Sequence, residues 1–251
     1  MSQDLLIIIP GFGGPNIEHK ISILQSNLNI IKGSWISNKI YIRIFVYDST
    51  IIQLLSKELV DNDIITWIIH KGIVGEFLIQ YTKNIQYNDD TYLLILLDDV
   101  ELNESVNINK MFKYYNDLSL DIISPALTHN SKYQFNYMLQ VPNNDNALYI
   151  TTACEFFCYF MKYSIYIENY YPYIDINNPW LWGMDMMLYN YFKLNVAIIN
   201  GMTMTHHYKN ISYDKSLPDP FVGQQYLFNK YNTNMENLSK QKAIRYIIYD
   251  V

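Results

Sequence analysis

The chain has 251 residues, of which 50% are hydrophobic and 17% charged. This composition excludes an intrinsically disordered chain, and the length is sufficient for one large α/β domain. The 24 acidic residues outnumber the 18 basic ones, and the net charge is −6. Such a balance argues against a surface that binds nucleic acid or anionic lipid through charge alone, so we expect no nucleic-acid partner. Any phosphate would have to be bound locally.

The beginning of the chain predicts a buried strand and not a signal peptide. An acid and no basic residue precede the apolar residues 5–9. Apolar runs elsewhere, such as residues 92–97 and 150–154, are shorter than the roughly 18 to 20 residues that cross a bilayer, so we expect no membrane span. Cys154 and Cys158 stand four residues apart in an apolar stretch, which predicts two reduced thiols on one helix face. A cytoplasmic location follows as a hypothesis.

Strands and helices alternate in the first half of the chain. Residues 5–9, 39–47, 64–69 and 91–97 are short apolar runs bounded by turn residues, as in buried strands. Residues 17–31 and 74–81 have helical spacing of apolar residues. Strands that are apolar on both faces and alternate with helices predict a mostly parallel central sheet flanked by helices on both faces. With no repeat or linker, we expect a single α/β domain over residues 1–251.

The second half has less regular patterns. Residues 120–124 predict a strand, 153–161 a helix or a strand, 185–191 a helix, and 195–205 a strand. Residues 217–220 predict a loop before a last helical or extended segment. Open parallel sheets bind ligands outside the carboxyl ends of their strands. Polar residues that follow strands are therefore the candidate site residues.

A group of acids follows the apolar strand at residues 92–97. Asp98 and Asp99 are adjacent, and Glu101 stands two residues further on. Crowded carboxylates have raised pKa values unless a cation lies among them. Mg²⁺ or Mn²⁺, held by one or two carboxylates and the phosphates of a substrate, would meet that need. The alternative is a solvated acidic turn.

This acidic turn resembles the D-x-D region of GT-A-type nucleotide-sugar glycosyltransferases. Other stretches resemble, in the same order, a little-characterised family assigned as glycosyltransferases, with the patterns Y-I-F-L-W-D-E-D, I-S-Q-P-A-L, G-W-G-L-D and V-V-H. The resemblance covers residues 5 to about 207 and rests on residues 5–10, 47–48, 70–72, 92–99, 123–127, 181–185, 197–200 and 205–206. It implies a GT-A fold with a nucleotide-binding half at about 1–103 and an acceptor-binding half at about 104–251.

The same resemblance implies a divalent metal, Mn²⁺ or Mg²⁺, on the acidic turn. Asp99 takes the place of the second acid of D-x-D, which binds the metal next to the donor diphosphate. Asp98 takes the middle position, and Leu97 stands where the family has its first acid. Asp98 could supply the ribose contact of that first acid through a shifted register.

A late histidine of the family completes the metal site, and His206 aligns with it. His207 is the competing residue, because the two histidines are adjacent. In the shifted register, Glu101 would join the metal site. Imidazole nitrogen and carboxylate oxygen are both suitable ligands for such ions.

Three aromatic or acidic stretches are implied on the acceptor side. Asp185 aligns with the acid that takes the proton of the acceptor hydroxyl, and its alternative role is to cap a helix. Glu155 lies where the family has residues facing the acceptor, or on the exposed edge of a helix. Trp180 and Trp182 fit either a sugar-stacking wall or the core.

Residues after the first two predicted strands are candidates for binding the nucleotide. Pro10, Gly11 and Phe12 lie in a glycine-containing turn that would let backbone groups approach the base and ribose. Asp48 follows the second strand and could accept a hydrogen bond from the base or a ribose hydroxyl.

Two lysines are candidates for the diphosphate. Lys71 precedes the acidic strand and Lys209 follows the two histidines. A lysine and a metal together would neutralise the leaving group. The alternative for each is an ordinary solvated surface lysine.

The sequence therefore predicts a metal-dependent glycosyltransferase that moves a sugar from a nucleoside diphosphate sugar, a UDP-sugar foremost, to a glycan or other hydroxyl acceptor. Two alternatives stay open: a catalytically degenerate module that binds nucleotide sugars, and a metal-dependent phosphohydrolase. The abundance of Ile, Asn, Lys and Tyr is typical of an AT-rich genome, such as that of a large DNA virus or a protist.

Overall fold

The computed structural model describes residues 3–35, 39–83, 85, 90–208, 217–238 and 243–248. Its strands are β1 (Leu5–Phe12), β2 (Ile40–Val46), β3 (Ile65–Ile69), β4 (Tyr92–Leu96), β5 (Val100–Leu102), β6 (Ile122–Leu127), β7 (Ala147–Thr151), β8 (Cys158–Lys162), β9 (Val196–His206) and β10 (Ala243–Ile248). Its helices are α1 (Ile17–Ser34), α2 (Thr50–Gln53), α3 (Lys57–Val60), α4 (Val74–Tyr81), α5 (Ile108–Asp117), α6 (Tyr163–Ile165), α7 (Met184–Met187), α8 (Pro220–Lys230) and α9 (Met235–Leu238). Short turns of 3₁₀ or π-helix form η1 (Asn136–Met138), η2 (Tyr166–Tyr170) and η3 (Tyr171–Tyr173).

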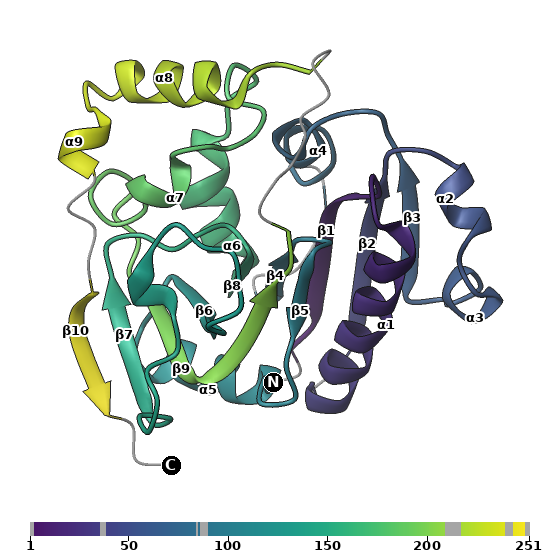
Figure 1. Ribbon diagram of the computed structural model, residues 1–251, viewed down its shortest axis with the longest axis horizontal. Helices are drawn as coiled ribbons and strands as arrows, with labels where there is room; N and C mark the ends of the chain where they lie inside the picture. Colours follow the sequence, from purple (N-terminus) through teal and green to yellow (C-terminus); the bar gives the residue numbers. More distant parts are fainter. Residues whose placement is uncertain are drawn as a thin grey trace.

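The strands form one mixed sheet in the order β10-β7-β9-β6-β8-β4-β1-β2-β3, with β5 paired to β9 (Figure 1). The strands β4, β1, β2 and β3 are parallel to one another, and β6 is parallel to β9. Antiparallel pairs join β4 to β8, β8 to β6, and β9 to β5 and β7. The predicted α/β class is confirmed, and the four adjacent parallel strands β4, β1, β2 and β3 come from the first half of the chain.

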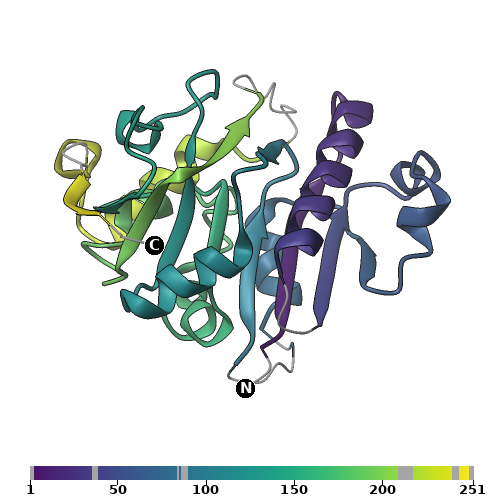
Figure 2. The ribbon, with the colours of Figure 1, turned by 90° about the horizontal axis from the view of Figure 1, so that it is seen from below.

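Helices cover both faces of the sheet, as predicted. The connection β1–α1–β2 moves across the sheet in one direction, and β3–α4–β4 moves in the other. Because such crossovers are right-handed, the two connections place α1 and α4 on opposite faces. Helix α5 contacts α1 (Figure 2). On α1, the buried side chain of Asn27 donates to the Val100 carbonyl and accepts from the Leu102 N–H, at 2.8 and 2.7 Å, which fixes this helix against β5.

The first predicted elements form close to their expected limits because their apolar patterns are unambiguous. All residues of β1 are buried, as expected for a central strand between two parallel neighbours. The helix pattern at residues 17–31 gives α1, and that at 74–81 gives α4. The strand expected at 195–205 is β9, and residues 217–219 precede α8 as a loop.

The prediction that the two cysteines share one helix face is wrong. Cys154 lies in a loop and Cys158 begins β8, which is one of the two options for residues 153–161. Strand β8 lies between β4 and β6 and is apolar on both faces, and such a run has no period that separates a strand from a buried helix. Both thiols are free and buried.

The helix expected over residues 185–191 is shorter in the structure. Helix α7 ends at Met187. The Tyr191 N–H still donates to the Met187 carbonyl, but Lys193 has a φ of 60° and the chain turns there into β9. A left-handed residue ends helical geometry, and no glycine in the sequence marks this turn.

Candidate functional site

A glycine turn follows β1 at the carboxyl edge of the parallel strands. Gly11 and Gly14 have φ values of 82° and 76°, a region that favours glycine. The register between β1 and β2 shifts between Ile9 and Phe12, so Pro10 lies at an irregularity where its missing N–H is tolerated. The Gly13 N–H then donates to Oδ2 of Asp98 at 3.0 Å. The turn and the acidic residues after β4 therefore form one site.

Asp98 lies between β4 and β5 and is largely buried. Besides Gly13, its Oδ2 accepts a hydrogen bond from Nζ of Lys20 at 2.8 Å. Burial raises the pKa of Asp98 to about 6, the charge of Asp99 adds to the rise, and Lys20 opposes it. A lysine from α1 thus binds the first of the two adjacent acids.

Lys20 was not among the site residues predicted from the sequence. Its Nζ also donates to the Gly13 carbonyl at 2.7 Å, and its side chain is 12% exposed. A signal was present: Lys20 follows Ile17 by three residues and precedes Leu24 by four, so all three share one helix face. A lysine on the apolar face of a helix that follows a glycine turn is a candidate for a buried ion pair.

His206 ends β9, and the antiparallel pairing with β5 places it opposite Val100, next to Asp99. Its Nε2 is 3.4 Å from Oδ2 of Asp99. Its Nδ1 lies 2.6 Å from the carbonyl oxygen of Lys132, which can only accept, so Nδ1 carries the proton. Burial lowers the pKa of His206, but hydrogen bonding to Asp99 and its charge outweigh burial and the net shift is upward. In the neutral imidazole, Nε2 presents its lone pair toward Asp99.

This pair fits two ligands of one divalent ion. A carbonyl that accepts from the distal N–H of a histidine is the usual outer partner of a metal-binding imidazole. Ligands about 2.1 Å from a common ion can lie up to about 4 Å apart, and 3.4 Å is within that limit. In the part of the chain that the structure describes, no group of three His, Cys, Asp or Glu side chains could hold a metal. Other ligands would then be water and phosphate oxygens.

The alternative metal residues are paired with each other. His207 Nε2 is 2.7 Å from Oε2 of Glu101. The ring centroids of His207 and His19 lie 4.8 Å apart. The backbone N–H of His207 donates to the Asp99 carbonyl. Glu101 and His207 are therefore hydrogen-bonded to each other beside the Asp99–His206 pair.

Asp185 lies in the first turn of α7 and is mostly buried. The N-terminal cap position belongs to Gly183, with a φ of 84°, and Oδ1 of Asp185 accepts from the Met186 N–H at 3.0 Å. Burial raises the pKa of Asp185 to about 7, and the charge of Glu155 contributes. The site thus contains a carboxyl group that titrates near neutral pH.

Glu155 interacts electrostatically with His206 and with Asp185. Its Oε1 accepts from the backbone N–H groups of Gln134 and Phe135, at 2.6 and 3.0 Å. Burial raises its pKa, while these hydrogen bonds and the charge of His206 oppose the rise. Because Glu155 interacts with both His206 and Asp185, these three residues belong to one electrostatic region. The side chain is 7% exposed, so Glu155 is not at an exposed helix edge.

Trp180 and Trp182 are half-buried beside α8. Trp180 Nε1 donates to the Pro218 carbonyl at 2.7 Å. The rings of Trp182 and Phe221 lie 5.0 Å apart in an edge-to-face arrangement. Both tryptophans thus contact α8 or the loop before it.

Two of the predicted nucleotide residues are exposed. Asp48 accepts from the Thr50 N–H at 2.9 Å, and its pKa is lowered by hydrogen bonds from Thr50 and by the nearby charge of Lys71. Lys71 is exposed in the turn before α4. The Phe12 side chain is buried, so any contact of Phe12 with a nucleotide would use its backbone. Lys209 lies outside the described residues.

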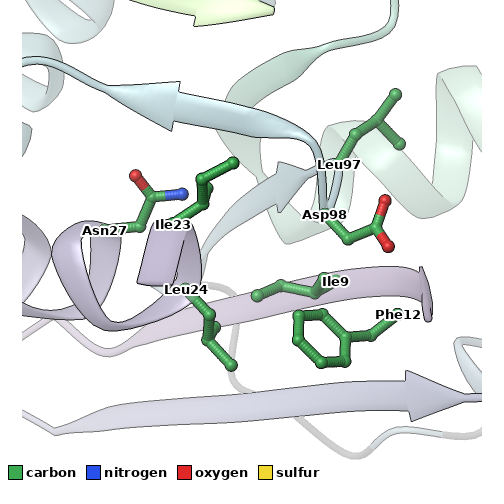
Figure 3. Close-up of a pocket in the computed structure, with 7 residues that line it drawn as sticks. All are labelled: Ile9, Phe12, Ile23, Leu24, Asn27, Leu97 and Asp98. Atoms are coloured by element: carbon green, nitrogen blue, oxygen red, sulfur yellow. The ribbon is translucent and has the colours of Figure 1, made fainter. Parts of the chain in front are cut away.

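A small apolar hollow lies between α1 and the ends of β1 and β4 (Figure 3). Its lining residues are Ile9, Phe12, Ile23, Leu24, Asn27, Leu97 and Asp98. The Leu97 side chain points away from Ile9 and Phe12 (Figure 3), but it is half-buried and packs against the hydrophobic core, where an acid would lose hydration. The leucine at the place of the first D-x-D acid therefore has a packing explanation.

No protein-family model matches the chain, and no curated protein matches it. Solved structures do. GalNAc-T7 with UDP, GalNAc and Mn²⁺ superposes with a TM-score of 0.58 at 8% identity, over 95% of this chain and 50% of that one. S. aureus TarS 1-349 in complex with UDP gives 0.51 at 10% identity, over 81% and 59% of the two chains. The chain thus spans about half the length of GalNAc-T7.

At these identities the likeness establishes the fold. The chain has the α/β architecture of GT-A-like nucleotide-sugar transferases. Among the described residues, no helix is both long and apolar enough to cross a membrane.

Proposed function

We propose that this protein is a metal-dependent glycosyltransferase that uses a nucleoside diphosphate sugar. The observation that carries the proposal is the approach of His206 Nε2 to Asp99 Oδ2 at 3.4 Å, beside the glycine turn and at the carboxyl edge of the parallel strands. This is the edge where open α/β sheets bind ligands. The fold shared with GalNAc-T7 and TarS, both solved with UDP, supports a UDP-sugar as the first donor to test.

The donor would lie across the ends of β1, β2 and β4. Backbone groups of Pro10, Gly11 and Phe12 would contact the base and ribose, with Asp48 at the exposed side. Asp99 and His206 would hold Mn²⁺ or Mg²⁺, and the bound ion would neutralise charge on the leaving diphosphate. Asp99 brings the carboxylate oxygen and His206 the nitrogen of this pair.

Asp185 would act as the base of an inverting transfer. Its carboxylate would take the proton of the acceptor hydroxyl while the hydroxyl oxygen bonds to the anomeric carbon and the bond from that carbon to the diphosphate breaks. A pKa of about 7 leaves much of the group ionised at neutral pH and makes it a stronger base than an ordinary aspartate. Trp180 and Trp182 would lie on the acceptor side of this region, near α8.

One observation favours a second function. Leu97 packs against the hydrophobic core at the position where the resembled enzymes have an acid. A module that binds the nucleotide sugar without turnover would tolerate the absence of this acid. Binding in the absence of any transfer or donor hydrolysis would support this second function.

A panel of nucleotide sugars tests the proposal. Each donor is added with and without Mn²⁺ in a thermal-unfolding assay, because a ligand that binds only the native state raises the unfolding temperature. Donors that shift the transition are then incubated with glycan acceptors, and nucleoside diphosphate release is measured. We expect a metal-dependent shift and acceptor-dependent release. Release of inorganic phosphate without an acceptor would instead indicate a phosphohydrolase.

A further inference from the structure

Lys20 places a positive charge inside an acidic site. Its ammonium donates to Oδ2 of Asp98 at 2.8 Å and to the Gly13 carbonyl at 2.7 Å. A lysine ammonium has three N–H donors, and these contacts use two of them. The pair is largely enclosed, with the side chains of Lys20 and Asp98 exposed by 12% and 11%. Enclosure reduces solvent screening, so this charge acts strongly on whatever binds next to it.

Without this lysine, the two acids and the metal of the proposed site leave no net positive charge for a diphosphate. Asp98 and Asp99 are two acids side by side, and a divalent ion on Asp99 and His206 would only compensate these two charges. A diphosphate brings further negative charge to the same place. Lys71, predicted for this task from the sequence, is exposed and lies near Asp48 instead. Among the ion pairs of the described residues, Lys20–Asp98 is the one that brings a lysine to the acidic turn.

We propose that Lys20 binds the diphosphate of the donor, directing its remaining N–H toward a phosphate oxygen while Asp98 and the Gly13 carbonyl hold the ammonium in place. This inference rests on the proposed function, since it names a further binding residue of the same site. Asp98 then has a positioning role: it orients the lysine and does not itself need to contact the donor.

The geometry explains why a lysine can be positioned here. Helix α1 starts directly after the glycine turn, so Lys20 lies one turn into the helix and reaches back to the Gly13 carbonyl. The Gly13 N–H donates to the same Oδ2 of Asp98. Gly13, Lys20 and Asp98 are therefore joined to one another by three hydrogen bonds. A rigid set of this kind loses little freedom when the phosphate binds.

Binding of UDP and of uridine separates this role from structural support of the turn. UDP is titrated by calorimetry at saturating Mn²⁺ into the wild type, Lys20→Met, Lys20→Arg and Lys32→Met, and uridine binding is followed by ligand-observed NMR. Lys32 is the matched control, because it lies exposed in the last turn of the same helix. Uridine has no phosphate, so a phosphate contact cannot affect it. Unfolding temperatures establish that each variant is folded.

We expect Lys20→Met to weaken UDP binding about 10- to 100-fold, as for loss of a charged hydrogen bond, and to leave uridine binding unchanged. Lys20→Arg should recover most of the affinity, and Lys32→Met should match the wild type. Equal UDP affinity in Lys20→Met and the wild type would overturn the inference. Equal losses for UDP and uridine would overturn it as well, because they would indicate support of the turn. Absence of UDP binding in the wild type would instead contradict the proposed function.

Discussion

The imidazole Nε2 of His206 lies 3.4 Å from the carboxylate Oδ2 of Asp99, although the two residues are far apart in the sequence. The antiparallel pairing of β5 with β9 brings them together, since it places His206 opposite Val100. The Lys132 carbonyl then fixes the protonated nitrogen of the imidazole. A carboxylate oxygen and an available nitrogen are thereby directed at one point.

Replacing His206 should weaken metal binding more than replacing its neighbour. His206→Gln removes the nitrogen next to Asp99, while His207→Gln removes a partner of Glu101. We expect Mn²⁺ affinity in the presence of UDP to fall at least about tenfold in His206→Gln and to change little in His207→Gln. Electron paramagnetic resonance of free Mn²⁺ measures this directly. The opposite ranking would assign the metal to the Glu101–His207 pair.

Asp185→Asn should abolish transfer, because an amide cannot take the proton of the acceptor. In the wild type, the rate of transfer should rise with pH through about 7, where Asp185 loses its own proton. The rate is measured with saturating donor and acceptor at pH values from about 5.5 to about 8.5, on both sides of this pKa. Full activity of Asp185→Asn would refute its role as the base.

The same substitution should stabilise the protein at high pH. The pKa of Asp185 is raised from 3.8 to about 7, so the native state keeps a proton that the unfolded chain has lost between these values. The free energy of unfolding therefore falls as pH rises through this interval, and the loss is complete above pH 7. At about 1.4 kcal/mol per unit, Asp185→Asn should gain at most about 4 kcal/mol at pH 8.

Urea unfolding at pH 4 and pH 8 measures this gain. Near pH 4 both proteins carry a neutral side chain at position 185, so their free energies of unfolding should agree closely. A variant that is less stable than the wild type at pH 8 would show that the Asp185 charge stabilises the fold.

Glu155 should hold in place the segment whose Lys132 carbonyl orients the His206 ring. Its carboxylate accepts from the N–H groups of Gln134 and Phe135, and Lys132 in the same segment binds the His206 ring. Glu155→Ala leaves two backbone donors without this acceptor and should cost about 1–3 kcal/mol of unfolding free energy, together with weaker Mn²⁺ binding. Glu155→Gln keeps an acceptor oxygen and should lose less of both. Unchanged Mn²⁺ affinity in folded Glu155→Ala would contradict this link.

The glycine turn should not tolerate a side chain at position 11. Gly11 has a φ of 82°, and an added Cβ would collide with the Tyr47 hydroxyl. Gly11→Ala should destabilise the protein by about 1–3 kcal/mol and weaken UDP binding. Gly33→Ala is the control: this helical position has open space, and alanine there should stabilise α1 by about 0.5–1 kcal/mol. Both are measured by urea unfolding.

Most of the parallel half of the sheet could be predicted from the sequence, because its short apolar runs are bounded by turn residues and alternate with helical patterns. This holds for β1, β2, β3 and β4 and for the helices α1 and α4. Strand β8 was ambiguous, because burial on both faces removes the period that would separate a strand from a buried helix. The end of α7 at Met187 depends on a left-handed residue that is not a glycine, for which the sequence has no sign.

The site was less predictable because it is built from contacts between distant segments. Asp99 and His206 were predicted as metal ligands through the resemblance of their motifs, and their side chains lie 3.4 Å apart in the structure. Lys20 was missed, since its partner Asp98 is 78 residues away and its pairing follows only from the packing of α1 on β1 and β4. For Leu97, the sequence showed the missing acid, and packing of Leu97 against the hydrophobic core supplies the physical reason.

The central claim is that Asp99 and His206 bind a divalent ion together with a nucleoside diphosphate. Calorimetric titration of UDP with and without Mn²⁺, into the wild type and Asp99→Asn, tests it most directly. We predict that Mn²⁺ strengthens UDP binding at least about tenfold in the wild type and not in Asp99→Asn. Equal UDP affinity with and without Mn²⁺ in the wild type would contradict the claim.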